Sequence, residues 1–257
     1  MFKEVTAVAA LTSEDPPDGS HLNIVDPYDG CTIGCPYCFQ RGDPSWSHPV
    51  LVKFNMPELL RRELSSWSPT EPVYVGSRCD PYMPIEKHYQ LTRRCLATLS
   101  DLHIPTYLCS KANPALISRD LDIMASFQAD FTVVLGLSNL SQIAKAGSAD
   151  KTQNVKFATQ LHNRGIKVWA FVMPVLPGIT DVHSIIEALP TDVPIWLFGL
   201  KRPVQSVAGK VLLKYISRHY PHLMQTYQQL YDGAPDAYYE RLFAEFSPSP
   251  RIRFPYG

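Results

Sequence analysis

Short β-rich runs alternate with helical segments from residue 22 onward, and this alternation constrains the fold more than any other feature of the sequence. Strands that alternate with helices predict βα units and a parallel sheet, because a parallel connection needs a crossover segment. Such a sheet can curl into an incomplete, TIM-like (β/α)6 barrel, whose open side admits a bulky substrate. Six strands of this α/β fold are expected, at Leu22–Val25, Val73–Ser77, Thr106–Ser110, Phe131–Leu137, Ile166–Val172 and Ile195–Leu200.

Helix signals follow the strands. Proline in the first turn marks helices at Pro57–Leu64 and Pro114–Phe127, and Gly165 stops a helix near Thr152–Arg164. The remaining helices are expected at about Pro84–Leu99, Asp181–Leu189, Val204–Tyr231 and Asp236–Phe246. The 257 residues suit one domain. We expect an N-terminal extension, a core over about 22–203 and a C-terminal helical region over about 204–257.

Three cysteines stand close together in the loop after the first predicted strand, in Cys31-Thr-Ile-Gly-Cys35-Pro-Tyr-Cys38. Thiolates at this C-x3-C-x2-C spacing can bind three irons of a [4Fe–4S] cluster, which leaves the fourth iron open to a ligand. A structural zinc site would add a fourth Cys or His at similar short spacing. The nearest histidines, His21 and His48, lie 10 residues outside the triplet on either side. The spacing favours the cluster; three unrelated cysteines, or a zinc loop with a distant ligand, are the alternatives.

The charge balance limits the classes of partner. Lys+Arg and Asp+Glu both number 24, so the net charge is zero, and attraction to nucleic acid or to an anionic membrane is weak. There is no run of 18 apolar residues and no secretory signal at the N-terminus. We therefore expect a cytoplasmic protein with no membrane partner, in a compartment that keeps thiols reduced. The other cysteines, Cys79, Cys95 and Cys109, are not expected to form disulfides.

The residues after the second predicted strand carry a more specific pattern, Asp80-Pro81-Tyr82-Met83-Pro84-Ile85-Glu86, followed by Leu91-Thr92-Arg93-Arg94. Three further segments fit the same pattern: Asp26-Pro27-Tyr28 with the cysteine loop, Ser110-Lys111, and the Pro174-x-x-Pro177-Gly178-x-x-Asp181 turn. Together they resemble the spore photoproduct lyase-like subgroup of radical S-adenosylmethionine (SAM) proteins. The likeness spans roughly residues 22 to 181 and says little about substrate.

The resemblance implies two cofactors and a mechanism. A [4Fe–4S] cluster on Cys31, Cys35 and Cys38 would bind SAM at its open iron. One electron, from a donor such as flavodoxin or ferredoxin, would cleave SAM to methionine and a 5′-deoxyadenosyl radical. This radical would then take a hydrogen atom from the substrate, while the protein supplies orientation and electrostatics.

The same likeness assigns cofactor-binding positions. Ser77 would lie near the SAM amino group, Lys111 near its carboxylate and Ser138 near the ribose hydroxyls. Charge supports Lys111, because a cation is the natural partner of a carboxylate; the alternative is an exposed loop lysine. The remaining cofactor-binding positions are Tyr37, the aromatic residue usual in this cysteine loop, Asp80 and Val175.

Cys79 is the candidate catalytic residue. Spore photoproduct lyases carry a cysteine at the end of this strand that returns a hydrogen atom to the product radical. Their cysteine lies three residues before the motif aspartate, whereas Cys79 lies directly before Asp80. Residues two apart along a strand point to the same face of the sheet. Cys79 can therefore point the same way as the cysteine of the lyases, and it can act as a hydrogen donor or contact the substrate. The alternative is a small buried apolar side chain.

Two classes of enzyme compete. The first modifies a peptide or natural-product precursor; one such class is the spliceases that act on ribosomal peptides with a small partner protein. The second is a DNA lesion lyase that resembles spore photoproduct lyase. A duplex-binding enzyme needs many Lys and Arg contacts to phosphate, so zero net charge disfavours a nucleic-acid partner and favours the peptide or small-molecule substrate. A non-catalytic Fe–S or zinc protein is the third interpretation.

Overall fold

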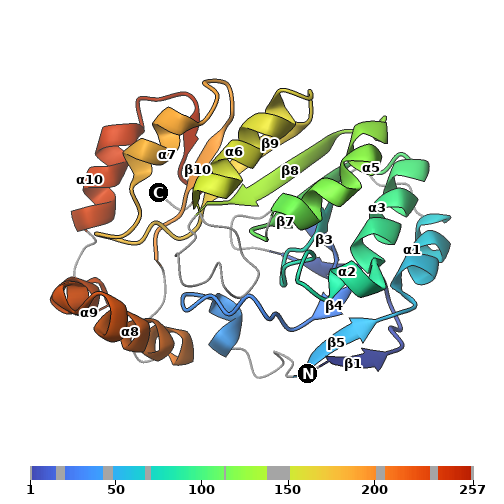
Figure 1. Cartoon of the computed structure of the whole chain (residues 1–257), viewed down its shortest axis with the longest axis horizontal. Helices are drawn as coiled ribbons and strands as arrows, with labels where there is room; N and C mark the ends of the chain where they lie inside the picture. The colour runs from blue at the N-terminus through green and yellow to red at the C-terminus, as the bar shows by residue number, and fades with distance from the viewer. Residues whose placement is uncertain are drawn as a thin grey trace.

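The structure is a computed structural model, and its curved central sheet carries most of the helices along one side (Figure 1). The account that follows covers the parts of the chain that the structure describes, which are residues 2–15, 21–42, 49–66, 71–112, 114–137, 151–200, 206–231 and 237–255.

The central sheet has the strand order β11-β10-β9-β8-β7-β6-β3-β2. All neighbouring strands pair in parallel except β2 and β3, which are antiparallel. The predicted α/β fold with a parallel sheet is therefore confirmed. In the described part of the chain β2 and β11 are edge strands, so the sheet does not close. The strands are β2 (Thr12–Glu14), β3 (Leu22–Val25), β6 (Val73–Val75), β7 (Thr106–Ser110), β8 (Phe131–Gly136), β9 (Lys167–Val172), β10 (Ile195–Leu197) and β11 (Ile252–Arg253).

The predicted helices are present, but three are interrupted. The segment expected at Pro114–Phe127 is divided by the 3-10 helix η2 (Ser118–Asp120). The segment expected at Pro84–Leu99 breaks at Gln90, which has a left-handed backbone with φ 51. The segment expected at Val204–Tyr231 breaks at Tyr220, directly before Pro221, because proline lacks the amide that a continuing helix would use. The helices are α1 (Met56–Leu64), α2 (Glu86–Tyr89), α3 (Leu91–Asp101), α4 (Pro114–Ile117), η2 (Ser118–Asp120), α5 (Leu121–Ser126), α6 (Lys151–His162), α7 (Val182–Ala188), α8 (Val207–His219), η4 (Pro221–Leu223), α9 (Met224–Tyr231) and α10 (Ala237–Phe246).

A first hydrophobic core lies between the outer face of the sheet and the helices. Strand side chains alternate between the two faces, and every second residue of the parallel strands enters this core. Its strand residues are mostly β-branched or aliphatic, and they pack with residues of α3, α6 and α7 such as Leu99, Leu161 and Ile185. Burying one such side chain contributes about 1.5–3 kcal/mol. This core fixes the strands whose ends carry the site.

A second, smaller sheet leads into the cysteine loop. It has the order β1-β5-β4, from β1 (Phe2–Val5), β5 (Val50–Lys53) and β4 (Tyr28–Asp29). The antiparallel pairing sets Tyr28 opposite Val52, and the chain then runs through the cysteines to the 3-10 helix η1 (Phe39–Gly42).

A second hydrophobic core surrounds the cysteine loop. It joins Tyr28, Cys35 and Cys79 to Leu212 and Tyr227 of the C-terminal helices α8 and α9. Figure 1 shows these two helices away from the row of outer helices. No helix in the described ranges combines the length and the apolar character needed to cross a bilayer.

Candidate functional site

The cysteine loop is shaped by backbone geometry and by one arginine. Gly34 has φ +76, a conformation that favours glycine. The Arg41 guanidinium of η1 donates to the Cys35 carbonyl oxygen at 2.8 Å and to the Gly34 carbonyl oxygen at 2.7 Å. The Cys38 amide donates to the Cys35 carbonyl oxygen at 3.2 Å. The loop that presents the three thiols is therefore hydrogen-bonded within itself.

The three thiols stand in a low-dielectric setting. Burial raises the pKa of Cys31 to about 12 and also raises the pKa of Cys38, so cluster binding would release protons. No three His, Cys, Asp or Glu side chains of the described ranges gather where a single metal ion could sit. A cubane cluster takes each thiolate on a different iron and does not need its ligands to meet at one point. Three thiols on one closed loop fit that donor set.

Lys111 brings a cation to the cysteine loop. It follows β7, and its Nζ lies 4.9 Å from the centroid of the Tyr37 ring and 3.5 Å from the Tyr37 hydroxyl oxygen. Burial lowers the pKa of Lys111, but Tyr37, Cys35 and Asp80 together raise it above its usual value, so the ammonium stays charged. A Cβ on Gly136 of β8 would lie 3.0 Å from the Lys111 Cβ. Glycine at that position thus leaves room for the lysine.

Asp80 holds two strand ends together. Its Oδ1 accepts from the Tyr82 amide at 3.0 Å and from the Ser110 hydroxyl at 2.9 Å, and its Oδ2 accepts from the Lys111 amide at 2.8 Å. Burial raises the pKa of Asp80, while these hydrogen bonds lower it. The carboxylate clamps the end of β6 to the end of β7 and so orients Lys111.

The other predicted cofactor-binding residues are placed differently. Ser77 is half-buried and follows Gly76, whose φ is +83. Val175 is fully buried in the first core; its amide donates to the Phe198 carbonyl oxygen and its carbonyl oxygen accepts from the Tyr239 hydroxyl. Ser138 lies outside the described residues. The cofactor contacts of these three residues stay predictions.

Cys79 belongs to the second core rather than to the core beneath the outer helices. Its thiol donates to the Tyr28 carbonyl oxygen at 3.0 Å. Burial raises the pKa of Cys79, with Asp26 and Cys31 among the nearby groups that add to the shift. The sulfur therefore remains an S–H group beside the cysteine loop, which is the form a hydrogen-atom donor requires.

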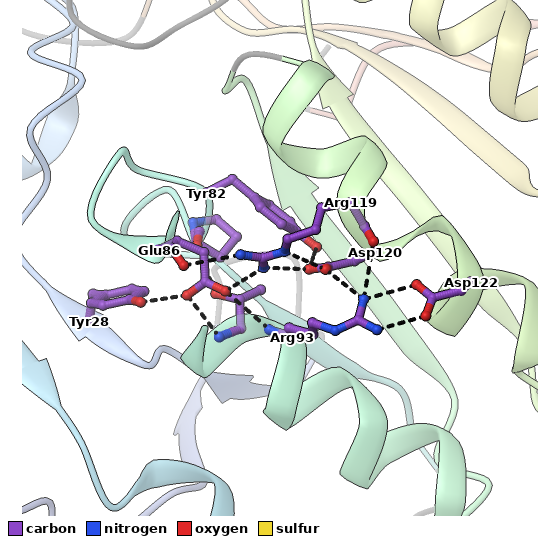
Figure 2. A network of polar contacts seen from close by, with 9 residues as sticks. Tyr28, Tyr82, Glu86, Arg93, Arg119, Asp120 and Asp122 are labelled. Atoms are coloured by element: carbon purple, nitrogen blue, oxygen red, sulfur yellow. Dashed lines mark hydrogen bonds and ion pairs between the residues drawn. The ribbon is translucent and has the colours of Figure 1, made fainter. Parts of the chain in front are cut away.

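A buried polar network contacts Tyr28, which leads into the cysteine loop. Figure 2 shows the Glu86 carboxylate between Tyr28 and Arg119. Glu86 is fully buried and accepts from the Tyr28 hydroxyl at 2.5 Å, from the Arg119 guanidinium at 2.8 Å and from the Thr92 amide at 3.1 Å. Tyr28 precedes the cysteine loop by three residues, so the network ties that loop to α2 and α3.

The network continues to Asp120, which is also fully buried. Its carboxylate accepts from the Tyr82 hydroxyl at 2.9 Å and from the guanidinium groups of Arg93 and Arg119 at 2.9 and 2.7 Å. Arg93 reaches onward to Asp122 (Figure 2). Buried charges paired in this way are costly to break, by about 3–5 kcal/mol when one partner is removed.

The sequence interpretation did not assign a role to Glu86, Arg119 or Asp120. Glu86 and Arg93, an acid and a base in the quoted motif, were a usable signal for a buried network, in which Glu86 pairs with Arg119 and Arg93 pairs with Asp120. Arg119 and Asp120 gave no such signal, because they lie some 30 residues further along the chain.

Two buried acceptor atoms, one directly after β3 and one in α6, have no partner among the described residues. Burial raises the pKa of Asp26, after β3, to about 7; its Oδ2 accepts from the Arg78 amide, while its Oδ1 has no hydrogen-bond partner among the described residues. Asn154 donates to the Gly136 carbonyl oxygen at 3.0 Å and leaves its own Oδ1 similarly unsatisfied. Buried polar atoms normally have partners, and a ligand with hydrogen-bond donors would satisfy both.

Two relatives share sequence with the chain. An uncharacterised protein of Methanocaldococcus jannaschii is 26% identical over 210 residues, which cover 77% of this chain and 76% of that protein. A radical SAM Nα-GlyT isomerase of Pseudomonas phage M6 is 26% identical over 182 residues, which cover 66% of this chain and 37% of the isomerase. No protein-family model matches the chain.

A mutant of spore photoproduct lyase superposes on the structure with a TM-score of 0.61, at 13% identity, over 86% of this chain and 66% of the lyase. The chain shares its fold with this lyase, and it carries three cysteines at C-x3-C-x2-C spacing. The predicted resemblance to the spore photoproduct lyase-like subgroup is confirmed. One structure of the lyase holds bound S-adenosylmethionine. The prediction of a radical SAM enzyme with a [4Fe–4S] cluster and SAM agrees with this fold and with the sequence shared with the radical SAM isomerase of the phage.

Proposed function

We propose that this chain is a radical SAM enzyme in which Cys31, Cys35 and Cys38 hold the cluster and Lys111 holds SAM. The position of Lys111 carries the proposal, since this half-buried lysine places its ammonium over Tyr37 of the cysteine loop. When bound, the cluster and SAM together supply a 5′-deoxyadenosyl radical for hydrogen abstraction. The protein's part is to bind and orient.

The residues around the loop divide this work. Lys111 neutralises and orients the SAM carboxylate, and Asp80 fixes the backbone from which Lys111 projects. The Glu86 network holds Tyr28, and through it the start of the loop. Cys79 keeps a proton on sulfur within the second core and is the proposed hydrogen donor or substrate contact.

The organisation of the chain is part of the proposal. Strands β3 and β6–β10 form the six units of an incomplete (β/α)6 barrel over about residues 22–203, and the region from about 204 to 257 covers it, within one domain. Because free thiols and a reducible cluster suit a reducing compartment, the cytoplasm is the proposed location, and flavodoxin or ferredoxin is the class of electron donor.

For the substrate, we propose a peptide or a natural-product precursor. One form of this function is a splicease-like maturase that acts with a small partner protein. The zero net charge of the chain supports this choice over a duplex. A DNA lesion is the second candidate, supported by the fold shared with spore photoproduct lyase, one structure of which is in complex with dinucleoside spore photoproduct.

Anaerobic reconstitution tests the proposal. With iron, sulfide, dithionite and SAM, the parent protein should form 5′-deoxyadenosine. The matched control is Cys109→Ala, which removes a thiol outside the loop and should leave the product unchanged. A reconstituted protein that binds iron but forms no 5′-deoxyadenosine would leave the non-catalytic Fe–S interpretation in its place.

A further inference from the structure

The two faces of strands β9 and β10 carry different side chains. On the outer face, Val168, Ala170 and Val172 of β9 and Ile195 and Leu197 of β10 are at most 4% exposed within the first core. On the inner face, the alternate positions are aromatic and half-buried: Trp169, Phe171 and Trp196. Tyr107 of β7 continues this row of rings, with its ring centroid 4.8 Å from that of Trp169.

The inner rings form one continuous surface. Trp169 and Phe171 both contact Trp196, with ring centroids 5.5 and 5.7 Å apart. Phe171 also contacts Phe198, at 5.0 Å, beyond the end of β10. Interplanar angles of 35° to 44° leave the rings tilted rather than stacked flat. We call Trp169, Phe171, Trp196 and Phe198 the aromatic inner face.

The aromatic inner face extends toward the strand ends that carry the site. Met173 continues the row of Trp169 and Phe171 at every second residue, and 41% of it is exposed. An exposed methionine at the end of a row of half-buried rings is a soft, adaptable contact for a flat ligand. The surface therefore lies on the sheet face opposite the outer helices and reaches the C-terminal ends of the strands.

One polar atom of this surface lacks a described partner. The Trp196 Nε1 is buried and donates to no acceptor among the described residues. Buried indole N–H groups usually find an acceptor. The unmet donor lies among apolar rings, so the group that satisfies it must itself sit against those rings.

We propose that the aromatic inner face is the substrate-recognition surface of the enzyme, and that it takes a planar conjugated ring with a hydrogen-bond acceptor on its edge. The ring lies against Phe171 and its neighbours, and the edge oxygen accepts from Trp196. This inference rests on the proposed function and deepens it by naming the recognised group. Such a ring can come from an aromatic amino-acid side chain or from a pyrimidine nucleoside, and the experiment separates the two.

The experiment measures binding to the cluster-reconstituted protein with SAM but no reductant, so that no SAM cleavage is needed. The probes are N-acetyl-L-tyrosinamide and thymidine, with N-acetyl-L-leucinamide as the control without a ring. Dissociation constants come from ligand-observed NMR titration. Phe171→Leu on the inner face is matched by Phe131→Leu on the outer face, where Phe131 stacks on Phe127 at 4.3 Å.

One aromatic probe should bind about tenfold or more tightly than the leucine derivative. Phe171→Leu should weaken it about fivefold and Phe131→Leu less than about twofold. Trp196→Phe, which keeps a ring but removes the donor, should also weaken it. The tighter probe identifies the source of the ring.

Aromatic probes that bind no better than the leucine derivative, or equal losses in the Phe171 and Phe131 variants, overturn the inference. A separate assay of 5′-deoxyadenosine on the parent protein keeps the two proposals apart. A protein that cleaves SAM but binds neither ring loses only this inference. A protein that binds a ring but does not form 5′-deoxyadenosine would contradict the proposed function.

Discussion

The two hydrophobic cores of the chain differ in what they are made of. The first core is mostly aliphatic and joins regular strands to the outer helices, as Leu99 and Leu161 do. The second core mixes thiols and phenols, such as Cys35, Cys79 and Tyr28, with the C-terminal helices. We expect folding stability to rest mainly on the larger first core, whereas the second core holds the groups proposed to perform chemistry. Matched substitutions in the two cores can test this division.

The largest effect is expected from removing a thiol. Cys35→Ala should lose SAM cleavage entirely, because the loop offers no other thiolate for that iron, while Cys95→Ala in the first core should keep full activity and lose about 1 kcal/mol of stability. Iron content, 5′-deoxyadenosine formation and thermal melting check the pair. Iron retained at the parent level in Cys35→Ala would remove the loop from the cluster site.

Apolar truncation in each core should cost similar stability but different function. Leu99→Ala and Ile216→Ala each shorten a fully buried side chain and should lower the free energy of unfolding by about 2–5 kcal/mol. Only Ile216→Ala, beside the cysteine loop, should speed the loss of iron to a chelator. Urea unfolding and chelator kinetics measure the two effects, and equal iron loss in both variants would contradict the division.

Lys111→Met should weaken SAM binding by about 1.5–3 kcal/mol, since it removes a charge-assisted hydrogen bond. Lys167→Met is the control, because that lysine pairs with Asp130 on an exposed surface. Isothermal titration of the reconstituted proteins gives both affinities. Unchanged affinity in Lys111→Met would assign the lysine to packing on Tyr37 alone.

Two tyrosines offer a narrower comparison, because each donates its hydroxyl to a buried carboxylate. Tyr28→Phe, in the second core, and Tyr82→Phe, in the first, should each cost about 1.5 kcal/mol of stability. Only Tyr28→Phe should also slow SAM cleavage, since Tyr28 leads into the cysteine loop. Denaturant unfolding measures the stability, and single-turnover kinetics measure the rate of SAM cleavage. Equal cleavage rates in the two variants would show that the network contributes to stability alone.

The smallest effect on SAM cleavage is expected at Cys79. Cys79→Ala should leave the rate of 5′-deoxyadenosine formation within about twofold of the parent, because the residue is not proposed as a cluster ligand. Product analysis with the natural substrate should show less product or an altered one. Unchanged product would make Cys79 a packing residue of the second core.

The regular part of the fold could be predicted from sequence because its signals are local. The strand Thr106–Ser110 matches β7 at both ends, since alternating burial and flanking turns mark it. The strand β5 was not predicted, because its pairing with β1 and β4 depends on segments distant in sequence. The break at Gln90 was also missed, since glutamine gives no sign of a left-handed backbone.

The candidate site could be predicted in part. The cysteine spacing and the lysine after the third predicted strand were found, and the structure brings Lys111 to the cysteine loop. The role of Asp80 as a clamp between strand ends was not foreseen, because it depends on the Ser110 hydroxyl of a neighbouring strand. The aromatic inner face was missed for a similar reason: Trp169 and Trp196 meet only once the strands are in register.

The packing of α8 and α9 on the cysteine loop has a consequence for the sensitivity of the proposed cluster to dioxygen. Tyr227 is fully buried and donates to the Pro177 carbonyl oxygen at 3.1 Å, which ties α9 to the turn after β9. Leu212 and Ile216 of α8 share the second core with Cys35. Residues that follow the barrel strands in sequence therefore pack around that thiol. If Cys35 holds an iron as proposed, substitutions in α8 and α9 would change how fast dioxygen reaches that iron without altering the strands.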